Sequence, residues 1–266
     1  MVGPAWDPGQ YLKFGDHRGR PFVELLAAIP ADASAARNVV DLGCGPGHLM
    51  GLLRGRFPVA RLIGVDSSAD MVDKARAATA DMTEVEVIEG EVESWRPDAS
   101  ELPVDVVVSN ALFQWVPGHE QLLGEIVSWL ADDGVVALQV PGNFDCPSHV
   151  IAHELAASAK WAARLEGVGW PAAPGPIEYL DVLMPLCAAV DTWETTYSMV
   201  LPGDDPVLEW MKGTTLRPVL TRLDSTEAEE FCDDLREPLR AAYPARPWGT
   251  VFPFRRTFAV ACQPRR

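Results

Sequence analysis

Short apolar runs alternate with helix-patterned segments along the first half of the chain. The apolar runs are VVDL (39–42), LIGVD (62–66), VEVIEG (85–90), VDVVVSN (104–110) and GVVALQV (134–140). The segments with helical spacing are HLMGLLRGRF (48–57), ADMVDKARAA (69–78) and GHEQLLGEIVSWLADDG (118–134). Short strands of the buried type that alternate with helices indicate a parallel sheet covered on both faces. The pattern therefore predicts a doubly wound α/β fold.

The pattern changes after Pro141. Helical spacing covers 149–165, 177–189, 206–222 and 226–242, and strand-like runs lie at TWETTYSMV (192–200) and VFPFRRTFAVAC (251–262). We expect these two runs to complete one seven-stranded, mainly parallel sheet, and the helices to be insertions that form a lid. The predicted organisation is a single domain, 1–266, with a lead-in strap (1–20), a cofactor-binding core (21–145) and a helical cap with the last two strands (146–266).

Composition narrows the class of partner. The chain has 266 residues and a formal net charge of -16, which argues against nucleic acid and against an anionic membrane surface. No apolar run is long enough for a membrane helix, and the first residues lack the features of a secretory signal. Its five cysteines are scattered and form no CxxC, so we expect a cytoplasmic protein without a zinc site or a disulfide framework.

The most specific local signal is the glycine turn DLGCGPG (41–47) after the first predicted strand. Glycines at this point let the backbone approach a ligand where a Cβ atom would collide. A dinucleotide fingerprint, GxGxxG, would need a third glycine at position 48, which is His48. The spacing is instead GxGxG, with Asp41 two residues before the first glycine and Asp66 at the end of the second strand. The alternative interpretation is a tight turn in which Asp41 only caps the following helix.

The turn resembles motif I of the class I S-adenosylmethionine methyltransferases, and VDSS (65–68) resembles their second acidic motif. S-adenosylmethionine has a cationic amino-acid end, with which Asp41 is compatible, and ribose hydroxyls that Asp66 is placed to bind. Ser67 or Ser68 is a ready N-cap for the next helix. The candidate cofactor-binding residues are Asp41, Gly43, Gly45, Gly47, Asp66, Ser67, Met71, Glu91, Val92 and Asn110.

A second resemblance covers the chain from end to end. It is carried by WDPGQYLKFGDHRGRP (6–21), SNALFQWVPGHEQLL (109–123), QVPGN (139–143), EWMKGTTLRPVL (209–220) and FPFRRTFAVA (252–261). These segments resemble the trans-aconitate 2-methyltransferases. The match is weakest at 145–176, and FPFRR carries an extra arginine.

The resemblance implies methyl transfer from S-adenosylmethionine to a carboxylate of trans-aconitate, which yields a monomethyl ester and S-adenosylhomocysteine. A carboxylate has a pKa near ~4 and is already ionised at pH 7, so the transfer needs no general base. We therefore expect in-line displacement by positioning alone, with no catalytic acid or base and no metal.

The resemblance also implies cationic contacts for a small polycarboxylate. We expect a helix to start at Pro21, so that Tyr11, Arg18 and Arg20 belong to a strap that folds over the cofactor site. The alternative is a loosely packed tail with arginines paired to surface acids. The candidate substrate-binding residues are Tyr11, Arg18, Arg20, Trp115, Asn143, Tyr197, Arg217 and Arg256, with Arg255 interpreted as the surface neighbour of Arg256.

Four other interpretations are open at this point. His149 and His153 have the i, i+4 spacing of two metal ligands, but no third ligand is identifiable. An NAD-dependent oxidoreductase is disfavoured by His48. A binding module could hold S-adenosylmethionine without chemistry. A related methyltransferase could esterify another carboxylate, such as that of a malonyl thioester. The oligomeric state is not fixed, and a monomer is compatible with the sequence.

Overall fold

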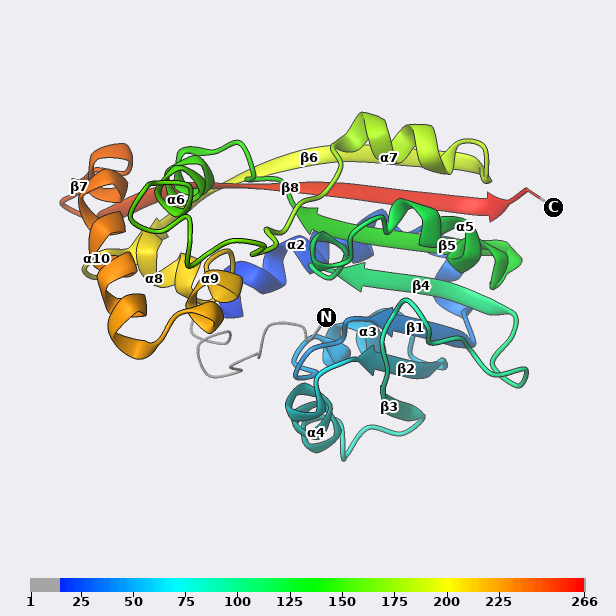
Figure 1. The fold of residues 1–266 in the computed structure, drawn as a ribbon. Helices are drawn as coiled ribbons and strands as arrows, with labels where there is room; N and C mark the ends of the chain where they lie inside the picture. The colour runs from blue at the N-terminus through cyan, green and yellow to red at the C-terminus, as the bar shows by residue number, and fades with distance from the viewer. Residues whose placement is uncertain (1–14, 266) are drawn as a thin grey trace. The chain divides into compact units, whose positions relative to one another are not determined.

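The computed structural model describes residues 15–265, without the side chains of residues 16–18 and 32. Its central feature is a sheet in the order β3-β2-β1-β4-β5-β8-β6, to which the two-residue strand β7 is added by pairing with β8 (Figure 1). The strands are β1 (Asn38–Leu42), β2 (Arg61–Asp66), β3 (Val85–Glu89), β4 (Val104–Asn110), β5 (Leu130–Pro141), β6 (Cys187–Leu201), β7 (Ala245–Arg246) and β8 (Gly249–Pro264).

The pairing confirms the predicted doubly wound, mainly parallel sheet. Strand β1 pairs in parallel with β2 and β4, β2 with β3, and β4 with β5. Strand β8 lies antiparallel to β5, with Pro141 opposite Arg256. The seven strands of the main path correspond to the seven apolar runs, and β7 is an addition that the sequence pattern did not predict.

The helices lie between the strands in chain order. They are α2 (Gly15–Ala28), α3 (Met50–Arg56), α4 (Ala69–Ala78), α5 (Glu120–Ser128), α6 (Pro147–Ala156), α7 (Pro176–Leu183), α8 (Pro206–Lys212), α9 (Arg217–Arg222) and α10 (Ser225–Ala242), with 3-10 turns η1 (Ala31–Ala35) and η2 (Phe113–Trp115). Helix α4 has the predicted bounds, and Ser68 is its N-cap, accepting from the Met71 backbone N–H. No helix of residues 15–265 is long and apolar enough to cross a membrane.

The predicted helix start at Pro21 is wrong. Helix α2 begins at Gly15 and contains Pro21. A proline disfavours helical geometry in the residue before it, but this local preference does not always mark a helix boundary. Buried packing of Phe22 and Leu25 anchors the helix after the proline, and the chain before it continues the same helix. Within the predicted strap, residues 15–20 are therefore helical, and residues 1–14 lie outside the described part.

The helix predicted over 118–134 is too long. It ends at Ser128, and β5 begins at Leu130. The N–H of Val104 donates to the Trp129 carbonyl at 2.9 Å, so the backbone at Trp129 pairs with β4 and does not continue the helix. A Cβ atom on Gly134 would come within 2.8 Å of Leu130 Cβ, which shows how tightly β5 bends there. The helical periodicity of 118–134 could not show that its last residues pair with β4.

Three helices of the second half are also shorter than predicted. Helix α6 ends at Ala156, and α7 ends at Leu183, four residues before β6 starts. The segment 206–222 divides into α8 and α9 around Gly213. Gly213 and Pro218 both disfavour a helix interior, which accounts for the division.

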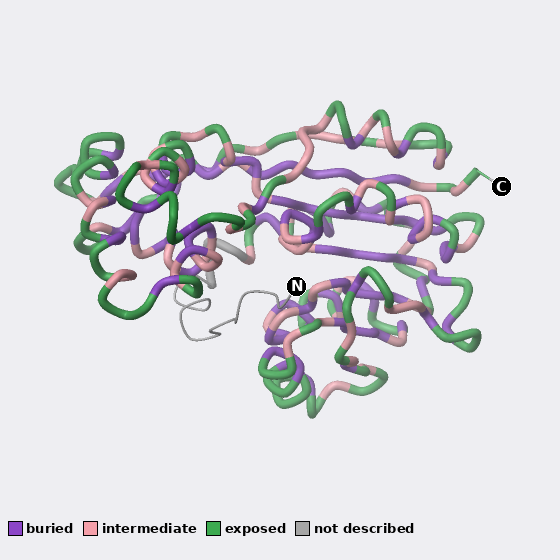
Figure 2. Tube along the Cα trace, viewed as in Figure 1, coloured by how far each residue is buried: buried purple, intermediate pink, exposed green. Residues whose placement is uncertain are grey.

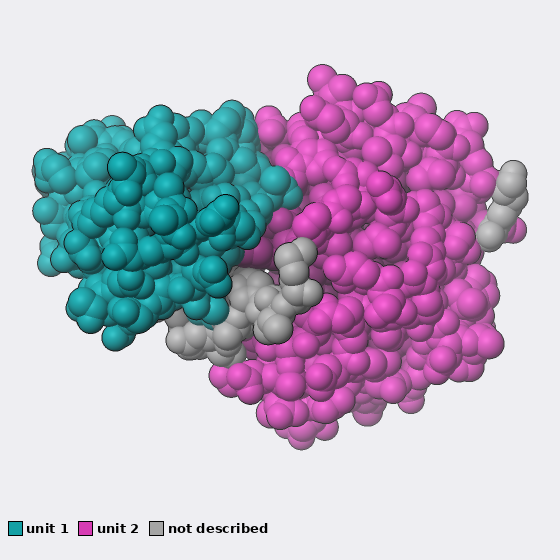
Figure 3. Space-filling view, in the orientation of Figure 1, with its two compact units in different colours: residues 1–15, 142–172, 196–255 teal, residues 16–141, 173–195, 256–266 magenta. Residues whose placement is uncertain are grey.

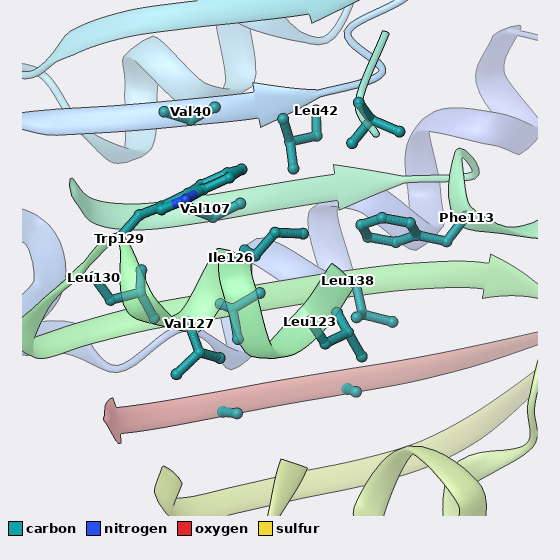
Figure 4. Packing of buried hydrophobic residues seen from close by; sticks show 14 of the residues in the cluster. Val40, Leu42, Val107, Phe113, Leu123, Ile126, Val127, Trp129, Leu130 and Leu138 are labelled. Atoms are coloured by element: carbon teal, nitrogen blue, oxygen red, sulfur yellow. The ribbon is translucent and has the colours of Figure 1, made fainter. Parts of the chain in front are cut away.

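Buried apolar side chains from β1, β4 and β5 pack against α5 on one face of the sheet (Figure 4). Leu42, Leu138, Leu123 and Phe113 belong to this cluster, and each is at most 1% exposed. Figure 2 shows the strands at the middle of the sheet as its most continuously buried part. Trp129 adds an edge-to-face contact with Trp95 at 5.8 Å.

The opposite face of the sheet is covered by α2 and α3. Glu24 of α2 accepts hydrogen bonds from Trp193 Nε1 at 3.3 Å and from Thr195 Oγ1 at 2.6 Å. Trp193 stacks on Phe258 of β8, with ring centroids 4.8 Å apart. A Cβ atom on Gly64 of β2 would lie 3.0 Å from Cys44 Sγ and 3.7 Å from Cε of Met50 in α3, so α3 packs over β2 at ordinary contact distance. Both faces of the sheet are therefore covered, as a doubly wound fold requires.

The chain divides into two compact units, coloured in Figure 3. Unit 2 comprises residues 16–141, 173–195 and 256–266, and unit 1 comprises 1–15, 142–172 and 196–255. Unit 2 holds the parallel strands and the glycine turn, and unit 1 holds α6 and α8 to α10. The change from unit 2 to unit 1 after Pro141 lies close to the predicted core boundary at 145. The single domain and the lid remain predictions.

Candidate functional site

Two glycines of the turn after β1 are required by the turn's own geometry and packing. Gly43 and Gly47 have φ angles of 74° and 75°, a region that side chains rarely adopt. A Cβ atom on Gly43 would lie 2.8 Å from the Cβ of Leu112, the residue before η2. A Cβ atom on Gly47 would lie 2.8 Å from the backbone Cα of Ala75 in α4. These two glycines let the turn pack closely against its neighbours.

Gly45 is different. Its φ angle is 56°, yet a Cβ atom built on it would meet nothing within 4 Å. The described residues therefore leave space beside Gly45 that their side chains do not fill. A backbone with left-handed geometry and open space beside it can accept the close approach of a ligand.

Asp66 fixes this turn from the end of β2. Its Oδ2 accepts from the N–H of Gly45 at 2.9 Å, and its Oδ1 accepts from the N–H of Ser68 at 3.0 Å. Burial raises the pKa of Asp66, and these two backbone hydrogen bonds act in the opposite direction. A carboxylate has about four acceptor positions, so Asp66 keeps capacity for ligand hydroxyls.

Asp41 is the unusual acid of the site. It is 4% exposed, and its carboxylate has no hydrogen-bond or ion-pair partner among the described residues. Burial, with a smaller contribution from the charge of Asp66, raises its pKa from 3.8 to about 7. Buried carboxylates are ordinarily paired, because desolvation is costly. An unpaired acid at the carboxyl end of a central strand is suited to a cationic ligand group.

The carboxyl end of β4 offers a second unpaired group. Oδ1 of Asn110 is buried and has no hydrogen-bond partner in the part of the chain that the structure describes. The next residue, Ala111, has a φ of 60°, which is strained for a residue with a side chain. Gln114 of η2 holds this strained residue, because its Nε2 donates to the Ala111 carbonyl at 2.6 Å. Sequence reasoning predicted Asn110 but missed Gln114.

Strand register places four polar side chains on one face of the sheet. Asp41 lies opposite Val108, Asn110 opposite Gln139, and Arg256 opposite Pro141. Residues of the core cluster, such as Val40, Val107, Leu138 and Ala259, occupy the alternate positions of the same strands. Because side chains alternate between faces, Asp41, Asn110, Gln139 and Arg256 share the other face. We call these four residues the polar row.

The remaining predicted cofactor residues have ordinary surroundings. Ser67 and Glu91 are exposed, at the ends of β2 and β3. Met71 is buried in the first turn of α4, and Val92 is buried in the core cluster. Their contacts with a cofactor stay predictions.

The predicted substrate residues are spread over the chain. Tyr11 and the side chain of Arg18 lie outside the described part. Arg20 is exposed on α2, and Trp115 is half-buried in η2. Arg256 is 5% exposed, which is unusual for an arginine.

The other predicted substrate residues belong to unit 1. The Asn143 side chain binds backbone: its Nδ2 donates to the Pro253 carbonyl at 3.1 Å, and its Oδ1 accepts from the Arg255 N–H at 2.8 Å. Tyr197 is buried in β6, and Arg217 is half-buried at the first position of α9. Arg255 binds Asp145 and the Gly142 carbonyl, so it is committed to a contact within unit 1.

The two histidines with metal-ligand spacing have other partners. His149 is buried, with Nε2 2.8 Å from Thr215 Oγ1 and Nδ1 3.2 Å from Ser148 Oγ. The His153 ring lies against Trp170, with centroids 4.1 Å apart. Residues 15–265 contain no group of three side chains arranged to hold a metal ion.

The class of protein follows from the fold, the glycine turn and two comparisons. A sequence-family model described as a methyltransferase domain matches residues 39–134. The solved structure of coclaurine N-methyltransferase, bound to N-methylheliamine and S-adenosylhomocysteine, superimposes with a TM-score of 0.53. The match covers 91% of this chain and 72% of that one, at 15% identity. The protein has the fold of the class I methyltransferases.

Relatives of much higher identity define the family. A trans-aconitate 2-methyltransferase from Streptomyces avermitilis is 48% identical, over 97% of this chain and 97% of its own length. Another, from Rhodococcus jostii, is 47% identical, over 96% of this chain and 98% of its own. The chain belongs to the trans-aconitate 2-methyltransferase family.

Proposed function

We propose that this chain transfers a methyl group from S-adenosylmethionine to a carboxylate of trans-aconitate, yielding a monomethyl ester and S-adenosylhomocysteine. The observation that carries the proposal is the 48% identity, over nearly the whole chain, to a protein named for this reaction. The proposed partner is therefore a small polycarboxylate.

The glycine turn supports the choice of methyl donor. S-adenosylmethionine, when bound, supplies a methyl group activated by its positively charged sulfur. Asp41 is a buried acid that has no hydrogen-bond or ion-pair partner within the described part of the chain, so it suits the ammonium group of the donor's amino-acid end. Gly45 leaves the approach to the backbone open, and Asp66 retains acceptor capacity for ribose hydroxyls.

The acceptor needs little chemical help. A carboxylate is ionised at pH 7 and carries its own nucleophilic electron pair, so no residue has to remove a proton. One carboxylate oxygen forms a bond to the methyl carbon, and the electron pair of the broken carbon–sulfur bond remains on sulfur. The residues of the site orient the oxygen and exclude water, effects that can contribute several kcal/mol, up to ~7–11 kcal/mol in the best cases.

Arg256 is the strongest candidate for holding the substrate. It is the buried cationic member of the polar row, and arginine binds carboxylates with two parallel hydrogen bonds. The roles of Tyr11, Arg18, Arg20, Trp115, Asn143, Tyr197 and Arg217 stay predictions.

A methyl-transfer assay tests the proposal directly. Protein and isotopically labelled S-adenosylmethionine are incubated with trans-aconitate, cis-aconitate, isocitrate, citrate or a malonyl thioester, and the label is recovered as a base-labile methyl ester. We expect the label to pass preferentially to trans-aconitate. Transfer to the malonyl thioester alone would identify a related esterifying enzyme, and donor binding without transfer to any acid would indicate a binding module.

A further inference from the structure

Gln139 is the member of the polar row that neither the glycine motif nor the predicted substrate contacts include. It lies near the end of β5, in the segment QVPGN, and is 1% exposed. Its register partner in β4 is Asn110. A glutamine at a central strand position buries an amide with two donors and one acceptor, which all require partners.

Of the two polar atoms of this amide, Oε1 has a hydrogen-bond partner among the described residues and Nε2 has none. Arg256 Nη1 donates to Gln139 Oε1 at 3.5 Å. A guanidinium has no acceptor atom, so this contact fixes the oxygen toward Arg256 and directs Nε2 away from it. Nε2 of Gln139 is buried and has no hydrogen-bond partner among the described residues. An unsatisfied buried donor costs about 1–3 kcal/mol, so its retention calls for a physical reason.

The neighbours of Nε2 indicate which ligand group would satisfy it. Arg256 is positively charged, and Gln139 Nε2 is a neutral donor on the same face of the same sheet. Two donors side by side, one of them cationic, match the two oxygens of a carboxylate. Asp41, the acid of the polar row, lies on β1, two strands away from β5 in the sheet order. The row therefore places its acid on β1 and its donors toward β8.

We infer that Gln139 is a substrate-binding residue, whose Nε2 donates a hydrogen bond to a carboxylate of the acid substrate beside Arg256. The inference rests on the proposed function, because it takes a carboxylic acid as the methyl acceptor. Oε1 of Gln139 at the same time orients the guanidinium of Arg256. The Gln139 amide thus contacts both Arg256 and the substrate carboxylate that Arg256 holds.

The test separates binding of the acid from binding of the donor. The variant Gln139→Met keeps the length of the side chain and removes both polar atoms. The matched control is Gln121→Met, the same change at an exposed position of α5. Affinity for trans-aconitate is measured by calorimetry on protein saturated with S-adenosylhomocysteine, which has no methyl group to transfer, and the affinity for S-adenosylhomocysteine is measured alone.

We expect Gln139→Met to weaken trans-aconitate binding by about 10- to 100-fold, as loss of a hydrogen bond to a charged group does. The affinity for S-adenosylhomocysteine should stay within about twofold of wild type, which also verifies folding. Gln139→Glu should weaken acid binding further, because its carboxylate repels the substrate and pairs with Arg256. Gln121→Met should bind both ligands as wild type does.

Trans-aconitate affinity within twofold of wild type in Gln139→Met would overturn the inference and leave the proposed function intact. If Gln139→Met does not fold, Gln139→Leu, which also removes both polar atoms without adding a charge, gives the same decision. Wild-type protein that binds no carboxylic acid would overturn both proposals together. If the wild type esterifies a different acid of the panel, the proposed substrate fails, and the same variants titrated with that acid decide the role of Gln139.

Discussion

Buried polar side chains are treated differently in two regions of this molecule. In unit 2, Asp41, Asn110 Oδ1 and Gln139 Nε2 of the polar row have no hydrogen-bond partner among residues 15–265. In unit 1, the buried His149 is bonded through both ring nitrogens, to Thr215 and Ser148. The backbone N–H of Ser148 is itself bonded to the Tyr243 hydroxyl at 3.1 Å. Other buried polar atoms of unit 1, such as His153 Nε2 and Ser158 Oγ, have no hydrogen bond among the described residues, so the comparison is between the polar row and the cluster around His149.

If the proposed function holds, the difference separates groups that stabilise the fold from groups whose pairing a ligand completes. A buried polar atom that pairs internally contributes about 1 kcal/mol of net stability, whereas one left unpaired costs about 1–3 kcal/mol. A protein retains the second kind where a ligand completes the pairing. Substitutions in the polar row should therefore alter binding more than stability, and those around His149 should do the reverse.

Asp41→Asn tests this contrast with the largest expected effect. The change preserves shape and removes the charge, so the donor's ammonium would lose its ionic partner. We expect the affinity for S-adenosylhomocysteine, which keeps the ammonium, to fall by about 100-fold. Calorimetric titration at pH 7.5 measures it. Affinity equal to wild type would show that Asp41 does not bind the amino-acid end.

The same variant makes a prediction about stability without ligand. The pKa of Asp41 is about 7 in the folded protein and 3.8 in its ordinary state, so the folded chain binds more protons between these values. Its contribution to stability therefore falls as pH rises from about 4 to 7. Above pH 7, Asp41→Asn should be more stable than wild type, by urea denaturation. A less stable variant would mean that the charge has a stabilising partner.

Gly45 and Gly47 allow the effects on stability and on ligand binding to be compared within one turn. Gly47→Ala places a Cβ atom 2.8 Å from the Ala75 backbone, so we expect a loss of about 2–3 kcal/mol of stability. The added Cβ atom of Gly45→Ala meets no atom of the described residues within 4 Å and should cost only the ~1–2 kcal/mol of left-handed geometry. Its methyl group would instead obstruct the ligand.

Urea denaturation and donor titration of the two variants decide the matter together. Gly45→Ala should show the smaller loss of stability and the larger loss of affinity per folded molecule. Equal losses of stability, with donor affinity retained in Gly45→Ala, would remove the open space beside Gly45 from the binding site.

Sequence reasoning predicted the parallel sheet and the glycine turn because both depend on local signals. A short apolar run followed by Asp41 and three glycines can be recognised as a strand and a glycine turn without knowledge of tertiary contacts. Asp66 and Asn110 could be predicted because parallel strands bring their carboxyl ends to one edge. Ser68 and α4 followed from capping chemistry alone.

The failures have tertiary causes. The end of α5 depends on pairing between Val104 and Leu130, and the start of α2 depends on packing after Pro21. Gln139 was missed because a buried glutamine becomes informative only when its partners are known. The signal was present in the sequence, since Gln139 interrupts an apolar strand near its carboxyl end, but the contact with Arg256 was needed to interpret it.

The smallest effect is expected at the paired cluster of unit 1. Thr215→Val removes the hydroxyl 2.8 Å from His149 Nε2 and leaves a buried ring nitrogen unpaired, so we expect a loss of about 1–2 kcal/mol of stability. Burial lowers the pKa of His149 from 6.5 to about 4, so the unfolded chain takes up the proton first. Stability from this residue is therefore lost as pH falls from about 6.5 toward 4, and His149→Gln should remove that part of the slope.

Urea denaturation of wild type, Thr215→Val, His149→Gln and the double variant between pH 4.5 and 8 measures both effects. Because the cluster pairs internally, S-adenosylhomocysteine affinity should stay within about twofold of wild type in all of them. A marked loss of donor affinity with unchanged stability would reverse the assignment, since His149 would then behave as the polar row does. Internal pairing would in that case be a poor guide to which buried polar groups serve a ligand.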